Sequence, residues 1–547
     1  MEQTYGINGF VYAKMIHAAS HSLKNQAKAV NDLNVFPIPD GDTGDNMLLT
    51  LQGGSNAVGE GADSVGETAR RAADGMLISA RGNSGVILSQ FFDGIAYGLE
   101  GVETADIPAL VKALKCGVDH AYNAVLEPTE GTILTVARCA SDAASKSGSE
   151  TPDKLLVSFI TEAKSTLEKT PDMLPVLKKA GVVDSGGAGL IYIMEGMLSA
   201  LTGKADFSAP VEASQTDAPS ELDLSLFDEN SVLEFGYCTE LLLRLQNAKC
   251  DAENFDVSVI TDYLATVGDS LVAFKTGTIV KIHVHTMTPD KVLSFCQQYG
   301  EFLKVKIENM SLQHNNATLD IKEEAGPVGE RKDYGVVAVC SGEGVRDFFL
   351  ERGADVIVSG GQSMNPSTED FLNAFRQVNA DTVLVFPNNS NIILAAKQAA
   401  EMYSDSDVRV IESRNLGDGF AALSMLCTDS GDTDAIVAEL TEAMQGVVTA
   451  EVSRSVRDTA ESVAGDYIGF VGKDILCDSS SRLECAKQTV DKAAFSMYDI
   501  MIVLFGKGVP EAEAEALKAY AEGKYSGKEV YVIDGRQDIY DYIMIME

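Results

Sequence analysis

The loop from residue 34 to residue 46 holds the side chains best suited to chemistry. It reads Asn-Val-Phe-Pro-Ile-Pro-Asp-Gly-Asp-Thr-Gly-Asp-Asn and places Asp40 and Asp42 two positions apart, with glycines at 41 and 44. Glycines let the backbone curl until both carboxylates face one ion. Because Mg²⁺ takes carboxylate oxygens and leaves its other positions to water and phosphates, the loop predicts a magnesium site. The alternative is an acidic turn that caps the next helix, with Asp42 or Thr43 as the N-cap.

Three further glycine-containing loops precede apolar, helix-like runs. They span residues 79–90, 128–132 and 183–190. Free backbone N–H groups and the positive end of a helix attract phosphate, so each loop could contact a nucleotide. One such loop is common at the start of a helix, whereas four in one helical region indicate a nucleotide cradle. The sequence has no G-x-x-x-x-G-K-[ST] run and is not that of a P-loop enzyme.

A second candidate metal site lies further along the chain. His283 and His285 are two positions apart in the strand-like run 278–285, so their side chains would project from the same face of a strand. Together with Cys238 they could form a three-ligand Zn²⁺ site, with water or a carboxylate as the fourth ligand. A purely structural or surface role for the two histidines is the alternative.

The four loops must be positioned by helices. Apolar residues spaced three and four apart predict helices over residues 9–30, 47–58, 65–77, 107–125, 133–144 and 158–167. Residues 204–230 are rich in Ala, Ser, Pro, Asp and Glu without periodicity, which predicts a linker. After it, residues 231–312 mix strand-like runs such as 239–245 and 278–285 with short helices, typical of a small α+β domain.

From about residue 333 short β-branched runs alternate with helical stretches such as 391–402. The predicted strands are 336–340, 356–359, 382–386, 408–411, 500–505 and 530–533. This alternation predicts parallel sheets covered by helices. The polar loops 359–368 and 386–391 follow predicted strands, where open α/β sheets bind ligands. Ordinary turns would explain the same residues.

Composition agrees with a multidomain, cytoplasmic protein. A chain of 547 residues is too long for one core and suggests about three domains. No signal peptide or membrane-spanning apolar run is visible, so no stable membrane insertion is expected. The nine cysteines contain no C-x-x-C pair, which favours reduced thiols. A net charge of −38 disfavours nucleic acid and anionic lipid as partners and supports solubility.

Three motifs resemble a known family. The runs Pro39-Asp-Gly-Asp-Thr-Gly-Asp-Asn-Met47, Arg81-Gly-Asn-Ser-Gly85 and Asp184-Ser-Gly-Gly-Ala-Gly189 resemble the nucleotide-binding DAK2 (DhaL-type) domain of dihydroxyacetone kinases. The whole chain is similar to the bacterial fatty acid kinase catalytic subunit family. That resemblance implies a barrel of antiparallel helices over residues 1–203, a linker at 204–230, an α+β middle domain at 231–325, and a DegV-like α/β domain at 326–547.

The resemblance also assigns residues. It implies that Asp40 and Asp42 bind Mg²⁺ in catalysis and that ATP is bordered by Thr43, Asn46, Ser84, Gly85, Thr132, Asp184 and Gly187. Dihydroxyacetone kinases carry a third metal-binding aspartate, whose nearest positions here are Asn34 and Val35. Asn34 could supply a neutral oxygen to the metal or form a turn. The family's middle domain shares the pattern of Cys238, His283 and His285, which implies zinc in a structural or dimer-supporting role.

The function implied by the resemblance is ATP-dependent phosphorylation of a fatty acid carboxylate. A separate DegV-like fatty-acid-binding protein would present the fatty acid, the product would be acyl phosphate, and the kinase would be a cytoplasmic homodimer. A carboxylate is already ionised at pH 7, so no general base is required. Two alternatives stay open: a dihydroxyacetone (glycerone)-type kinase acting on a small hydroxy compound, and a regulatory protein that senses nucleotide without transferring phosphate.

Overall fold

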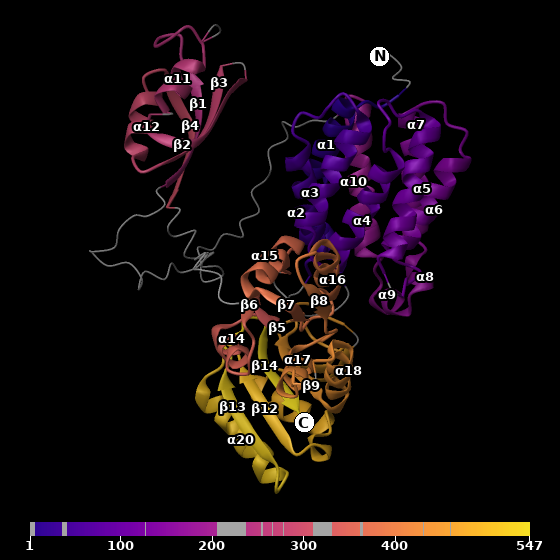
Figure 1. The fold of residues 1–547 in the computed structure, drawn as a ribbon, viewed down its shortest axis with the longest axis vertical. Coiled ribbons are helices and arrows are strands. Elements are labelled where there is room, and N and C mark those ends of the chain that lie inside the picture. Colours follow the sequence, from indigo (N-terminus) through magenta and orange to yellow (C-terminus); the bar gives the residue numbers. More distant parts are fainter. Residues whose placement is uncertain are drawn as a thin grey trace. The chain divides into compact units, whose positions relative to one another are not determined.

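The structure is a computed structural model that describes the chain except residues 1–5, 35–40, 126, 205–236, 253–254, 265, 277, 310–330, 362–364, 430 and 460. Side chains are also left undescribed at residues 238, 240, 242, 262, 269–274, 276, 279, 281, 283, 285, 304, 306, 308 and 309. The chain forms two compact units, one that combines residues 1–211 with 328–547 and one that spans 212–327 (Figure 1). The predicted linker lies outside the described residues from position 205 onward.

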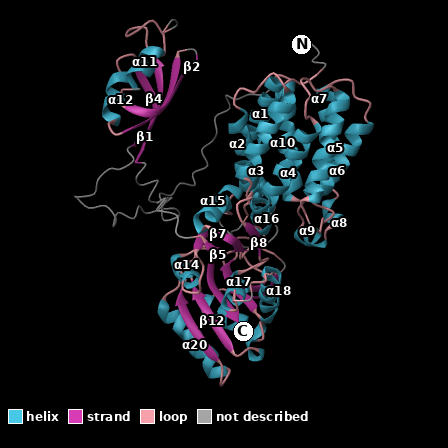
Figure 2. Ribbon diagram, viewed as in Figure 1, coloured by secondary structure: helices cyan, strands magenta, loops and turns pink. Residues whose placement is uncertain are grey.

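The N-terminal part of the first unit is helical (Figure 2). Its elements are α1 (Gly9–Asn31), α2 (Thr43–Val58), α3 (Val65–Ser79), α4 (Gly82–Gly98), α5 (Ile107–Asn123), α6 (Ile133–Lys146), α7 (Pro152–Leu167), α8 (Thr170–Met173), α9 (Pro175–Ala180) and α10 (Ser185–Leu201). Several starts are fixed by side-chain caps: Asn8 accepts from the Val11 N–H, and Ser64 accepts from the Glu67 N–H. These caps satisfy N–H groups that have no partner within the helix.

Eight long helices pack side by side in a closed order. Each of α1 to α6 packs against the next, and α10 packs against both α7 and α1. One continuous core lies inside the ring, with Leu23, Leu51, Phe92, Phe159 and Ile193 almost fully buried. Because neighbours joined by short loops run in opposite directions, alternate helices begin at the same end.

The predicted helices are confirmed, and their starts differ where cap chemistry decides. α2 begins at Thr43, four residues before the predicted start, because the glycine-containing loop already turns into the helix. α7 begins at Pro152 rather than at residue 158, since proline at the first helical position needs no N–H partner. Apolar periodicity reports the packed face of a helix and misses its polar first turn.

The second unit is a four-stranded antiparallel sheet with two helices. Its elements are β1 (Tyr237–Leu245), α11 (Ser258–Leu264), β2 (Gly268–Thr276), β3 (Ile279–Thr286), α12 (Pro289–Cys296) and β4 (Gly300–Asn309), and the strand order is β2-β3-β1-β4. Alternate residues of β1 and β3, including Leu241, Leu243, Ile282 and Val284, face the core with Ile260 of α11.

The C-terminal part of the first unit contains two sheets. The first has the parallel order β6-β5-β7-β8 and is built from β5 (Lys332–Cys340), β6 (Val356–Ser359), β7 (Ala380–Phe386) and β8 (Asp407–Val410). Its helices are α14 (Glu343–Leu350), α15 (Thr368–Val378), α16 (Ile393–Met402), α17 (Leu416–Ser424) and α18 (Thr433–Ala443). The prediction of a parallel sheet with alternating helices is confirmed here.

For the second sheet the prediction of parallel strands is wrong, because most of its strand pairs are antiparallel. Its order is β11-β10-β9-β14-β12-β13, and the only parallel pair among its described strands is β12 with β13. The elements are β9 (Val448–Arg454), β10 (Tyr467–Val471), β11 (Asp474–Ser479), α19 (Arg482–Lys492), β12 (Ile500–Phe505), α20 (Glu511–Lys524), β13 (Glu529–Asp534) and β14 (Tyr540–Met546). A hairpin joins β10 to β11 through Gly472, whose φ of +59° suits glycine, so these strands must be antiparallel.

Candidate functional site

Four helices of the ring begin together at one end. The hydroxyl of Ser185, the first residue of α10, donates to Thr43 Oγ1, the first of α2, at 3.3 Å. α4 meets α2 where Gly82 packs against the Asn46 amide, and α10 meets α6 where Gly186 packs against Ile133. The helix starts that follow the four glycine-containing loops singled out in the sequence therefore meet at one end of the ring. Their free N–H groups make this end suitable for phosphate.

Asparagine side chains hold the connection between α1 and α2. Asn31 Oδ1 accepts from the Gly44 N–H at 2.6 Å, and its Nδ2 donates to Asp45 at 2.8 Å. Asn34 Oδ1 accepts from the Thr43 hydroxyl at 2.8 Å. Asn34 thus supports the turn through Thr43. Whether it also contacts metal stays a prediction, as do the nucleotide contacts assigned to Thr43.

Asp42 is a half-buried carboxylate at this end of the ring. It precedes α2 as the N-cap, but its side chain makes no capping hydrogen bond. Oδ2 instead accepts from the Asn365 amide at 2.6 Å, and a second amide comes from Asn46. Burial raises the pKa of the Asp42 carboxyl to about 6, although both amides favour the ionised form. Asp40, the other predicted ligand, lies outside the described residues.

At Gly82 and Gly85 the start of α4 is packed too closely for a side chain. Gly82 has a φ of +57°, and a Cβ there would lie 2.7 Å from Asn46 Nδ2 and 2.9 Å from Asn365 Nδ2. A Cβ on Gly85 would lie 2.4 Å from the Thr50 hydroxyl. These glycines let the backbone at the start of α4 lie against the side chains of Asn46, Asn365 and Thr50. Ser84, predicted to contact phosphate, is half-buried in the first turn of α4.

Asp184 and Thr132 begin the other two helices. Asp184 Oδ2 accepts from the Gly187 N–H at 2.7 Å, which makes it the N-cap of α10. Burial raises the pKa of this carboxyl to about 6. The Thr132 hydroxyl donates to the Thr129 carbonyl at 2.8 Å. Both residues have structural roles at helix starts, and their contacts with nucleotide remain predictions.

Sequence reasoning missed the contact that Asn365 makes at this end. Asn365 comes from the C-terminal part of the chain, and its backbone carbonyl accepts from Arg81 Nη1 at 2.8 Å. The backbones of Arg81 and Ser367 form an antiparallel bridge, and the Thr368 N–H donates to the Ala80 carbonyl at 3.1 Å. The run 359–368 was singled out as a strand-end loop. Its position after a predicted strand indicated a ligand-binding loop, but it did not show that the loop contacts Asp42.

The candidate zinc residues lie on neighbouring strands of the second unit. The backbone register pairs Cys238 of β1 with His285 of β3, and Glu240 with His283. The side chains of these residues are outside the described part, so zinc stays a prediction. Among side chains that are described, no group of three His, Cys, Asp or Glu residues is placed to hold a metal ion.

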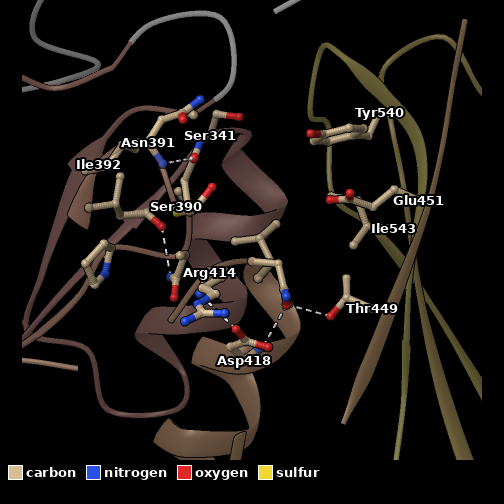
Figure 3. A pocket seen from close by; sticks show the side chains of 18 of the residues that line it. Ser341, Ser390, Asn391, Ile392, Arg414, Asp418, Thr449, Glu451, Tyr540 and Ile543 are labelled. Atoms are coloured by element: carbon tan, nitrogen blue, oxygen red, sulfur yellow. Dashed lines mark hydrogen bonds between the residues drawn. The ribbon is translucent and has the colours of Figure 1, made fainter. Parts of the chain in front are cut away.

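A cavity of about 790 Å³ lies where the predicted ligand loops end. Figure 3 shows Ser341, Ser390 and Asn391, which follow strands of the parallel sheet, facing Tyr540 and Glu451 of the other sheet. Its wall also includes Asn83 of α4, whose Nδ2 donates weakly to the Ser390 carbonyl at 3.5 Å. The cavity thus extends from the carboxyl ends of the parallel strands to the loop that begins α4.

Comparison with known proteins gives the chain its family. Residues 37–199 match the DAK2 domain, 234–317 match the FakA-like middle domain of fatty acid kinases, and 335–547 match the FakA-like C-terminal domain. Protein YloV of Bacillus subtilis is 39% identical over 99% of both chains. The chain belongs to the FakA-like fatty acid kinase family. A further relative, uncharacterized protein SSP1546 of Staphylococcus saprophyticus, is 35% identical over 99% of both chains.

The chain shares a weaker likeness with two solved structures. Dihydroxyacetone kinase from C. freundii, in complex with AMP-PNP and Mg²⁺, is 19% identical and covers 36% of this chain and 35% of its own, with a TM-score of 0.27. The Streptococcus pneumoniae Fatty Acid Kinase B3 protein loaded with linoleic acid is 12% identical. The match covers 40% of this chain and 99% of the B3 protein, with a TM-score of 0.29. In the described part of this chain, no helix is long and apolar enough to cross a membrane.

Proposed function

We propose that the chain is the ATP-dependent catalytic component of a fatty acid kinase, which transfers the γ-phosphoryl group of ATP to a fatty acid carboxylate. The observation that carries the proposal is the position of Asp42, a half-buried carboxylate at the end of the ring where four glycine-containing helix starts meet. Membership of the FakA-like fatty acid kinase family supports the same activity.

The residues fit a hard divalent cation. Within the described part of the chain, the donors that reach the Asp42 carboxylate are the neutral amides of Asn46 and Asn365 rather than a lysine or arginine. A partly desolvated carboxylate without a cationic partner is costly, and a bound cation would relieve that cost. Mg²⁺ would be held by Asp42 and Asp40, with Asn34 as the third candidate ligand. When bound, it would neutralise charge on the phosphates.

The helix starts would bind and orient the phosphate chain. N–H groups at Gly82 to Ser84 and at Ser185 and Gly186 would face the triphosphate, and preformed donors lose little free energy when charge develops. Thr43 and Ser185 add hydroxyls between α2 and α10. Catalysis then depends on positioning and electrostatics, as is usual for phosphoryl transfer.

The acceptor needs no base from the protein. A carboxylate oxygen of the fatty acid attacks the γ-phosphorus, the bond to the ADP oxygen breaks, and acyl phosphate and ADP result. Because the carboxylate is ionised at pH 7, no proton has to be removed. We propose that a separate DegV-like fatty-acid-binding protein presents the acid, since the strong negative charge of −38 disfavours direct extraction from anionic membranes.

The test is ATP consumption by the purified chain with oleate, with and without a DegV-like fatty-acid-binding protein from the same cell, together with direct measurement of acyl phosphate. We expect acyl phosphate only with the carrier, and none with Asp42→Ala. ATP consumption with dihydroxyacetone as the only acceptor would identify a glycerone-type kinase instead. Tight nucleotide binding without turnover on any acceptor would identify a nucleotide sensor.

A further inference from the structure

The segment from Asn365 to Thr368 belongs to the C-terminal part of the chain but is fastened to the helical ring. Arg81 holds it twice, through its guanidinium to the Asn365 carbonyl and through a backbone bridge to Ser367. The Thr368 N–H adds a bond to Ala80. All of these contacts fall on the residues that immediately precede Gly82, so the segment is fixed to the start of α4.

A buried polar contact beside this segment strengthens the attachment. Gln398 of α16 is 6% exposed, and its Nε2 donates to the Leu77 carbonyl at 2.7 Å and to the Thr368 hydroxyl at 3.1 Å. Its Oε1 accepts from Gln90 Nε2 at 3.1 Å. A buried amide with its hydrogen bonds satisfied specifies one docked arrangement, because a shift would leave its groups unpaired.

The Asn365 side chain reaches from this fixed backbone to Asp42. The residue is 2% exposed, and Nδ2 donates to Asp42 Oδ2 at 2.6 Å. An ionised carboxylate only accepts hydrogen bonds, so the amide must turn its nitrogen toward Asp42. Oδ1 of Asn365 is buried with no hydrogen-bond partner. An unpaired buried acceptor costs free energy. A contact that served only to hold the two parts together would not require this cost.

We infer that Asn365 is a positioning residue for phosphoryl transfer, supplied by the C-terminal part of the chain to orient the Asp42 carboxylate toward the cation. This inference rests on the proposed function, because it takes Asp42 as a metal ligand. Hydrogen bonds from a second residue to a metal-binding carboxylate fix its orientation, and their removal typically weakens metal binding by about 10- to 100-fold. The nucleotide site is then complete only when the C-terminal part is docked.

The experiment measures Mn²⁺ binding to the full-length chain with AMP-PNP, by the EPR signal of free Mn²⁺. We expect Asn365→Ala to weaken Mn²⁺ binding by about tenfold or more. Asn373→Ala, which changes a half-buried asparagine of the same C-terminal part that accepts from Arg376, should match the wild-type chain. Gln398→Ala removes a docking contact away from Asp42, and we expect it to weaken Mn²⁺ binding much less than Asn365→Ala.

The outcomes separate this inference from the proposed function. Mn²⁺ affinity of Asn365→Ala within twofold of the wild-type value would overturn the inference alone. Equal losses in Asn365→Ala and Gln398→Ala would also overturn it, since docking in general rather than this amide would then set the affinity. Absence of Mn²⁺ and AMP-PNP binding by the wild-type chain would overturn both proposals.

Discussion

At the scale of single residues, burial controls the chemistry of both carboxyls at the end of the ring where the four helix starts meet. Asp42 and Asp184 both have pKa values raised to about 6 because water is partly excluded from them. Their partners differ, since Asp42 accepts from side-chain amides and Asp184 accepts from the N–H of Gly187. Asp42 therefore remains suited to bind a cation, whereas Asp184 already serves a helix start.

Asp42→Asn tests the metal assignment while keeping the shape of the side chain. We expect the rate of phosphoryl transfer to fall by at least about a hundredfold, because a metal ligand contributes several kcal/mol to the transition state. The melting temperature should not fall, since the substitution removes a buried charge. The measurement pairs initial rates with thermal unfolding. A rate close to that of the wild-type chain would exclude Asp42 as a required ligand.

Asp184→Asn tests the effect of burial on stability as pH changes. The folded pKa of about 6 lies above the unfolded value of 3.8, so the folded state holds the proton more tightly and the unfolding free energy decreases as pH rises from about 4 to above 6. An asparagine side chain does not ionise, so the substitution removes this decrease. Its amide oxygen can still accept from the Gly187 N–H. Because Asp184 is only half-buried, we expect a gain of about 1 kcal/mol at pH 7.5 and none at pH 3.5.

Urea unfolding at both pH values measures this difference. The substitution also changes the N-cap of α10, so any loss from weaker capping should appear equally at both pH values. The difference between the two values therefore isolates ionisation. An identical effect at pH 3.5 and pH 7.5 would contradict the assigned burial.

At the scale of elements, glycines set how closely the helices approach. Gly44 lies in the first turn of α2, and a Cβ there would lie 2.2 Å from the Ala27 carbonyl of α1. The Asn31 side chain then reaches the Gly44 N–H. The approach of α1 to α2 thus sets the path of the chain at Asp42, two residues earlier.

Gly44→Ala should destabilise the helical ring by about 2 kcal/mol, because backbone atoms of two helices would have to separate. The midpoint of urea unfolding measures this loss. Gly523→Ala in α20 is the matched control, since nothing lies within 4 Å of a Cβ there, and it should be neutral or stabilising by about 0.5 kcal/mol. Equal midpoints for the two variants would show that α1 can move away from α2 without cost.

Elements were predictable where a local pattern determines them. The helices of the ring follow from apolar spacing, and the parallel sheet follows from strands that alternate with helices. β9 and β10 were missed because runs such as Val-Thr-Ala-Glu-Val-Ser-Arg are short and partly polar, and they become strands through pairing with β14 and each other. Antiparallel pairing of β14 depends on contacts with β9 that lie far away in sequence.

The same distinction applies to the candidate site. That Asp42, Thr43 and Asp184 lie at one end of the ring could be predicted, because each belongs to a contiguous glycine-containing motif, while their contacts with metal and nucleotide stay predictions. Asn365 could not, since its role arises only when a loop more than 300 positions away along the chain docks beside Asp42. Periodicity and turn chemistry contain no information about such docking.

At the scale of the whole molecule, the helical ring and the C-terminal part share a buried interface. Ala80 and Val86 of the ring lie in one apolar cluster with Phe371 of α15 and Ala395 and Ala396 of α16. Around this cluster lie the polar contacts of Gln398 and Arg81. Apolar burial supplies the free energy of docking, and the polar contacts fix its register.

Val86→Asp should separate the two parts, because Val86 is 2% exposed and a buried, unpaired carboxylate costs several kcal/mol. In this variant we expect calorimetry to resolve the unfolding of the ring and of the C-terminal part as two transitions at different temperatures. In the wild-type chain the two transition temperatures should lie closer together. Val157→Asp is the control, since Val157 lies on α7 of the same ring and is 49% exposed. If docking brings Asn365 to Asp42, Val86→Asp should also weaken Mn²⁺ binding in the presence of AMP-PNP, and Val157→Asp should not. Separated transitions with unchanged Mn²⁺ affinity would show that the ring binds the cation without its C-terminal partner.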